Sequence, residues 1–155
     1  MAYLDVNRPA RRQFKARPTV ASGVVVVHTA ENTPDTIGPD GAAEAVAKFI
    51  QGRSDPGSYH RLVDSDSVVN LIEFRYQAYG DGTGSNPHAI HISAATKAAR
   101  WAQMPQAWRD ATVRNMAKAA SEASDYLHAL GKGRIPARRI NRAQSEAKVP
   151  GFISH

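Results

Sequence analysis

Two histidines follow apolar, strand-like segments, a position where enzymes often place reactive groups. His28 ends the run of residues 23–27, and His155 follows Phe152 and Ile153. Functional residues concentrate at strand ends in open sheets that are packed by helices. A neutral imidazole nitrogen at such a place can bind a metal ion. The structural alternative stays open at this point: His28 caps its strand, and His155 belongs to a disordered terminus.

Two further side chains could take part in chemistry beside such a metal. Glu31 lies three residues after His28, and a carboxylate near a metal-bound water can act as a general base. Tyr59 begins a later strand-like segment and could donate a hydrogen bond to a developing oxyanion. The alternatives are an exposed loop glutamate and a tyrosine that packs on the edge of the sheet.

The other histidines give weaker signals. His88 and His91 are three residues apart, but residues 88–93 alternate like a strand. Positions three apart on a strand point to opposite faces, so we do not expect these two side chains to chelate one metal together. His60 follows Tyr59 and is expected to support the sheet.

The pattern of apolar residues around these candidates predicts one α/β domain, with a central mixed β-sheet flanked by α-helices. The β-branched run at 23–28 is typical of a buried interior strand. The other expected strands are 58–64 and 68–72, which form a hairpin, and 88–93, with an extended segment at 149–155. The expected helices are 41–51, 96–102, 106–130 and 138–147.

The 155-residue length fits a single domain. Residues 1–22 are polar and basic, and we expect an arm that packs loosely on a domain formed by residues 23–155. Two polar loops, 32–40 and 80–87, are expected to frame a groove beside the reactive residues.

Composition narrows the classes of partner and of chemistry. The net charge of +6 favours polyanions, such as nucleic acid, anionic lipid or the acidic polymers of a cell wall. We expect no nucleic-acid partner, because the basic residues are scattered and no reader motif is present.

The absence of cysteine excludes disulfides, thiolate ligands and a cysteine nucleophile, so any metal must be held by histidines and carboxylates. No stretch has the roughly 20 apolar residues of a membrane span, and the N-terminus lacks the apolar core of a signal peptide.

Four motifs occur in an order that resembles the type-2 N-acetylmuramoyl-L-alanine amidases, the family that includes phage amidase lysins and peptidoglycan-recognition proteins. Residues 24–31 resemble the family's first strand and first zinc histidine. Residues 58–64 resemble its hairpin with the tyrosine, and residues 86–93 resemble the strand after an asparagine-containing loop. Residues 151–155 resemble the segment with the second zinc histidine.

The resemblance implies a zinc-dependent hydrolase that cleaves the amide bond between N-acetylmuramic acid and L-alanine. It implies Zn²⁺ held by His28 and His155, with Glu31 and Tyr59 as the catalytic candidates. In the family a third ligand, Cys or Asp, follows the second histidine. We therefore expect that ligand beyond residue 155 and regard 23–155 as a catalytic domain truncated at its C-terminal end. Some relatives carry a catalytic glutamate on the strand that contains Ser93 here, and a serine cannot replace that base.

The resemblance is greatest to endolysins of bacteriophages that infect actinobacteria. It implies peptidoglycan as the partner and an antimicrobial, cell-wall-degrading role. We expect a monomer, made in the host cytoplasm without a signal peptide, that acts on the cell wall. The alternative is a non-catalytic peptidoglycan-binding module, because some peptidoglycan-recognition relatives bind muropeptide without cutting it.

Overall fold

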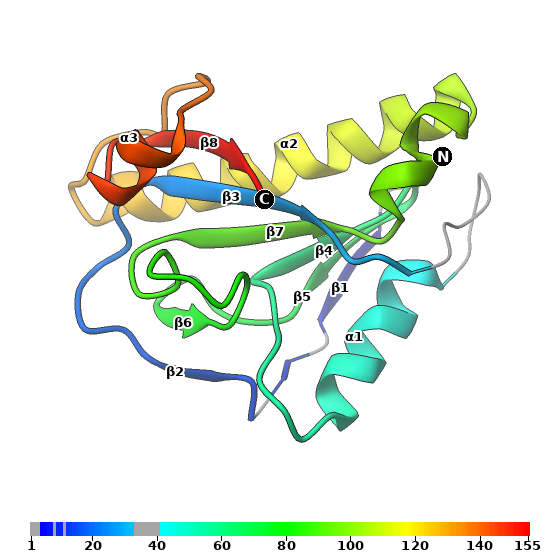
Figure 1. Ribbon diagram of the computed structural model, residues 1–155, viewed down its shortest axis with the longest axis horizontal. Helices are drawn as coiled ribbons and strands as arrows, with labels where there is room; N and C mark the ends of the chain where they lie inside the picture. The colour runs from blue at the N-terminus through cyan, green and yellow to red at the C-terminus, as the bar shows by residue number, and fades with distance from the viewer. Residues whose placement is uncertain (1–3, 8, 11, 33–40) are drawn as a thin grey trace.

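The computed structural model describes residues 4–7, 9–10, 12–32 and 41–155. Its centre is a six-stranded mixed sheet with the strand order β1-β5-β4-β7-β3-β8 (Figure 1). The strands of this sheet are β1 (Leu4–Asn7), β3 (Val24–Thr29), β4 (Arg61–Val63), β5 (Ser67–Asn70), β7 (Ile90–Ala94) and β8 (Gly151–Ser154). A second, two-stranded sheet pairs β2 (Phe14–Ala16) with β6 (Tyr76–Ala78). The helices are α1 (Ala42–Gly52), the 3-10 helix η1 (Ala98–Gln103), α2 (Gln106–Ala129) and α3 (Arg142–Glu146). The predicted class, a mixed sheet flanked by helices, is confirmed.

The β-branched run forms an interior strand, as its sequence predicts. β3 has parallel neighbours on both sides, β7 and β8. Val24, Val25 and Val26 are all buried, because helices or loops cover both faces of the sheet here. The expected hairpin is also confirmed, since β4 and β5 pair antiparallel.

The two long helices cover opposite faces of the sheet. Val25 and Ile92 pack with the apolar side of α2, whereas Leu62 and Val69 pack with α1. Side chains alternate between the two faces along a strand, so His28 lies on the face opposite α2. In Figure 1, α1 lies beside the β1 end of the sheet, away from β8.

The start of α1 is stabilised by a residue from the hairpin. Gly41, at the N-cap position, makes no side-chain cap. Instead Asp64 accepts the Ala43 N–H at 2.9 Å with Oδ2. Its Oδ1 accepts both the N–H and the hydroxyl of Ser67, each at 2.8 Å. One buried carboxylate therefore joins the hairpin turn to the helix, and it satisfies an amide that the helix itself leaves unpaired.

The prediction that the basic N-terminal segment packs loosely is wrong for its described residues. β1 adds a parallel strand to β5, and β2 pairs with β6. Arg17 donates hydrogen bonds to the carbonyls of Phe74 at 3.0 Å, Pro87 at 3.1 Å and Ala89 at 2.8 Å. Burial lowers the pKa of Arg17 to about 10, so the group stays charged at neutral pH. The planar guanidinium reaches several carbonyls at once, and this ties the segment to the loop before β7.

Most of the expected loop at 32–40 lies outside the described residues, since these omit 33–40. Within the part of the chain that the structure describes, none of the helices combines the length and the apolar character that crossing a membrane requires.

Candidate functional site

His28 and His155 meet at the carboxyl ends of two neighbouring parallel strands. Their ring centroids are 5.2 Å apart at an interplanar angle of 51°. The register of β3 and β8 pairs Val27 with Ser154, and the His155 N–H donates to the Val27 carbonyl at 3.0 Å. His28 is buried at 4 % exposure, whereas His155 is exposed. The two histidines singled out from the sequence thus lie side by side, one in the floor of the site and one at its rim.

Tyr59 is the third ring at this place. Its centroid lies 5.2 Å from that of His28. Burial is the largest cause that raises the pKa of the Tyr59 phenol, and the neighbouring Ser93 hydroxyl opposes part of this rise. Ser93 is fully buried and lies opposite His28 in the register of β3 and β7. Tyr59 therefore keeps its proton at neutral pH and can act as a hydrogen-bond donor.

Glu31 lies just after β3 and next to the start of η1, since its N–H donates to the Thr96 carbonyl at 2.9 Å. Its φ of 56° is in the left-handed region, which is uncommon for a residue other than glycine. The carboxylate accepts the Thr29 hydroxyl and the Ala98 N–H, the latter at 3.0 Å. These hydrogen bonds, that of Thr29 first, lower the pKa of Glu31. The side chain is exposed and ionised at neutral pH, and none of its hydrogen bonds within the described residues reaches His28.

His91 also belongs to this cluster, which the sequence did not reveal. Its Nδ1 lies 2.9 Å from His28 Nε2. The prediction that His88 and His91 do not act as a pair agrees with the structure, because the His88 ring contacts the Ser22 hydroxyl at 3.0 Å instead. The signal for His91 was the cross-strand register: β3 and β7 place it opposite Val26, on the His28 face. A single strand's sequence does not contain that information.

Burial lowers the pKa of the His28 and His91 imidazoles and keeps these two rings neutral. It is the largest cause that lowers the pKa of His28, to about 4; the charge of His155 adds to this effect and Asp81 opposes it. Burial first, and then the neighbouring His28, also lower the pKa of His91. At neutral pH His28 therefore offers an uncharged ring with a free lone pair, which is the form that binds metals.

The donor set fits part of a zinc site. His28 and His155 are adjacent imidazoles, and imidazole is a preferred zinc ligand. Because His28 Nε2 is occupied by His91, Nδ1 is the nitrogen that remains for a metal. Catalytic zinc sites usually combine three protein ligands with one water. Among the described residues, no group of three His, Cys, Asp or Glu side chains is arranged to hold a metal ion. Two adjacent histidines thus match two of the three protein ligands that such a site needs.

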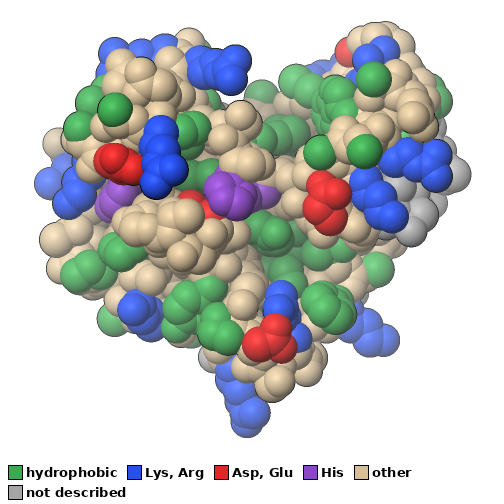
Figure 2. Space-filling view, viewed as in Figure 1, with side chains coloured by type: hydrophobic (Ala, Val, Ile, Leu, Met, Phe, Trp, Pro, Cys, Tyr) green, Lys and Arg blue, Asp and Glu red, His purple; other side chains and the backbone are tan. Residues whose placement is uncertain are grey.

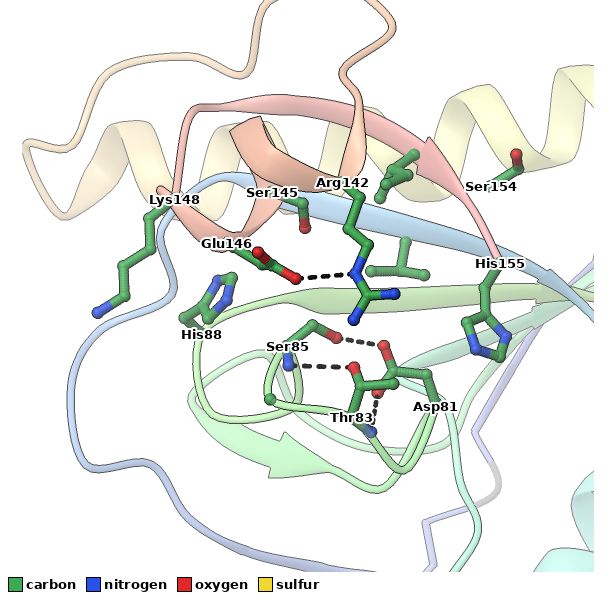
Figure 3. A pocket seen from close by; sticks show the side chains of 13 residues that line it. Asp81, Thr83, Ser85, His88, Arg142, Ser145, Glu146, Lys148, Ser154 and His155 are labelled. Carbon is green, nitrogen blue, oxygen red and sulfur yellow. Dashed lines mark hydrogen bonds and ion pairs between the residues drawn. The ribbon is translucent and has the colours of Figure 1, made fainter.

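A cavity of about 460 Å³ opens beside His155. Figure 3 shows His155 at one end of the cavity, with His88 and Lys148 at the other. Loop residues 81–85 line one side, in agreement with the expectation that loop 80–87 frames a groove. On the opposite side, Arg142 forms an ion pair with Glu146 at 2.8 Å. The space-filling view shows a histidine at the surface in the middle of this hollowed face (Figure 2).

The fold and the site together define an α/β protein with two adjacent histidines at the carboxyl edge of a mixed sheet. Residues 16–147 match the sequence family of the N-acetylmuramoyl-L-alanine amidases, and the chain belongs to this family. The resemblance to type-2 amidases is thereby confirmed.

Solved structures share the fold. The Staphylococcus aureus hydrolase AmiA, in complex with its ligand, has a TM-score of 0.64 and 17 % identity, over 99 % of this chain and 66 % of that one. A mutant endolysin from Bacillus subtilis has a TM-score of 0.52 and 19 % identity, over 81 % of this chain and 76 % of that one. PlyL has a TM-score of 0.53 and 15 % identity, over 83 % and 74 %. The chain therefore spans about two thirds of the AmiA structure. No curated protein sequence matches the chain.

Proposed function

We propose that the chain is the catalytic domain of a zinc-dependent amidase that hydrolyses the bond between N-acetylmuramic acid and L-alanine in peptidoglycan. The observation that carries this proposal is the juxtaposition of His28 and His155 at 5.2 Å in a chain of the amidase family. Zinc dependence is typical of that family. We further propose a phage lysin that is made in the bacterial cytoplasm and acts on the wall; an endolysin is among the proteins that share the fold.

His28 and His155 would hold the zinc ion, with a third protein ligand outside the described residues. When bound, zinc lowers the pKa of a coordinated water to about 7 and polarises the scissile carbonyl. The half-open setting suits this role. Burial of His28 fixes one ligand, while the exposed His155 leaves the site open to a polymer.

The neighbouring side chains would act on the amide. Tyr59 donates a hydrogen bond to the carbonyl oxygen as negative charge develops on it, and its raised pKa keeps the donor protonated. Glu31 is ionised and would take the proton of the attacking water and deliver it to the leaving nitrogen of L-alanine. The water oxygen bonds to the carbonyl carbon and the C–N bond breaks. The products are a lactyl carboxylate and a free amino terminus.

The direct test uses purified peptidoglycan and measures new amino termini together with the masses of the released products. We expect zinc-dependent release by the wild type and none by His28→Ala or His155→Ala. His128→Ala serves as a matched control, because His128 is an exposed histidine on α2. Full activity of His28→Ala would remove the metal site from the mechanism.

One observation favours a second candidate, a non-catalytic peptidoglycan-binding module. The described residues supply two metal ligands and not three. If the protein is such a binding module, we expect it to sediment with purified walls and to release no amino termini even with excess zinc. The two candidates therefore differ in the product assay and not in wall binding.

A further inference from the structure

His91 meets one proposed metal ligand through a buried hydrogen bond. His28 Nε2 and His91 Nδ1 are 2.9 Å apart, and His91 has no exposed surface. The two residues lie on neighbouring parallel strands, so the register of β3 and β7 fixes their contact. In a hydrogen bond between two imidazoles, one ring donates its proton and the other accepts with a lone pair.

The position of the shared proton follows from metal binding. A ligating imidazole uses a lone pair, and His28 Nδ1 is the nitrogen left for the metal because Nε2 faces His91. The proton of His28 must then lie on Nε2 and point at His91 Nδ1. We infer that His91 is a positioning residue, which accepts the His28 Nε2 proton and thereby presents His28 Nδ1 to the metal. This inference rests on the proposed metal site at His28.

Two neighbours hold the His91 ring in the accepting orientation. The His60 ring lies parallel to the His91 ring within 5°, with centroids 5.9 Å apart, and His60 Nδ1 accepts the backbone N–H of His91 at 2.9 Å. His60 is itself oriented, since its Nε2 lies 3.0 Å from both the Tyr76 carbonyl and the Arg17 guanidinium. On the other side, a Cβ at Gly80 would lie 2.2 Å from His91 Nδ1. Glycine is therefore required for the His91 ring to lie where it does.

This arrangement has a known energetic consequence. Groups that receive the second ring proton of a metal-bound histidine fix its tautomer and orientation, and their loss typically lowers metal affinity by about 10–100-fold. Such groups are usually carboxylates, carbonyls or water. Here a fully buried second imidazole takes that place.

The test measures the zinc affinity of the 155-residue chain by competition with a chromophoric chelator. His91→Phe keeps a planar ring and removes the acceptor, so we expect affinity about 10–100-fold weaker than that of the wild type. His91→Asn places an amide oxygen near the position of Nδ1 and should stay within a few-fold of the wild type. Gly80→Ala should also weaken zinc binding, because its methyl group displaces the His91 ring. Gly52→Ala is the matched control, since Gly52 ends α1 outside the cavity lining and a Cβ there meets nothing within 4 Å.

A second measurement needs no variant. In long-range ¹H–¹⁵N spectra of the zinc-loaded wild type, we expect His28 to carry its proton on Nε2, with slow exchange against water. Wild-type affinity in His91→Phe, equal losses in His91→Phe and His91→Asn, or a zinc-loaded His28 protonated on Nδ1 would overturn the role of His91 and leave the metal site intact. Zinc affinity in His28→Ala equal to that of the wild type would overturn the metal site, and the role of His91 with it.

Discussion

The imidazole of His28 and the phenol ring of Tyr59 lie with their centroids 5.2 Å apart at an interplanar angle of 49°. The two residues come from different elements: His28 from β3, and Tyr59 from the segment that leads into β4. A proton donor is therefore held beside a proposed metal ligand by the sheet itself. This placement is what an oxyanion-stabilising group requires.

Replacing Tyr59 by phenylalanine should separate catalysis from metal binding. Loss of one oxyanion donor typically lowers kcat about 10²–10³-fold. We expect Tyr59→Phe to show a loss of that order in the release of amino termini, with unchanged zinc affinity. Tyr76→Phe is the matched control, because the Tyr76 ring packs against Phe14 on the small sheet. A Tyr59→Phe enzyme with wild-type kcat would exclude the phenol from the mechanism.

Glu31→Gln tests the proton shuttle. The amide can still accept the Ala98 N–H, so the local structure should persist, while the base is lost. General-base catalysis typically contributes about 10²–10⁴-fold, and we expect kcat to fall within that range. Glu73→Gln is a control at an exposed glutamate outside the site. If Glu31→Gln retains wild-type kcat, the proton passes through another group, and Glu31 serves only to connect β3 with η1.

The stability of the metal-free protein should decrease on acidification. His28 has a pKa of about 4 in the folded state, against about 6.5 when unfolded. Between these values the unfolded state binds more protons, so the free energy of unfolding falls as the pH falls through this window. For His28 alone the loss from pH 7 to pH 5 is about 2 kcal/mol. Urea titrations at both pH values should show it, and His28→Ala should have a flatter pH dependence than His128→Ala. Equal pH dependence in the two variants would contradict the assignment to His28.

Removing Arg17 should destabilise the fold although it lies in a strongly basic segment. Its guanidinium donates hydrogen bonds to the carbonyls of Phe74, Pro87 and Ala89. These carbonyls would lose their donor. We expect Arg17→Met to lower the free energy of unfolding by about 3 kcal/mol, measured by urea denaturation. Lys15→Ala, an exposed change on β2 close by, should stay within about 0.5 kcal/mol of the wild type. A small effect of Arg17→Met would show that water can replace the guanidinium.

Those parts of the fold that depend on local periodicity could be predicted. The β-branched run predicted β3, and the apolar stripe predicted α2. The end of α2 is followed by Gly131, which has a φ of 73°. His28 and His155 were identifiable because each directly follows an apolar strand. Local patterns were sufficient in each of these cases.

The features that were missed depend on pairing between distant segments. β1 and β2 have only four and three residues, and their partners are far along the chain. The burial of Arg17 runs against the usual exposure of charged residues, and only the tertiary structure shows the carbonyls that compensate it. His91 became recognisable only when the register of β3 and β7 placed it next to His28.

The position of β8 at the edge of the sheet has a dynamic consequence. β8 pairs with β3 on one side, and on the other side the described residues contribute an isolated bridge between Arg139 and Phe152. Edge segments with few partners open more easily than the centre of a sheet, so β8 can detach while β7 stays folded. A zinc ion held by His28 and His155 binds only the docked form and must therefore favour it. Amide protons of residues 151–155 should exchange more slowly as zinc is added, whereas those of β7 should not respond. Zinc binding would then hold the last strand against the rest of the sheet.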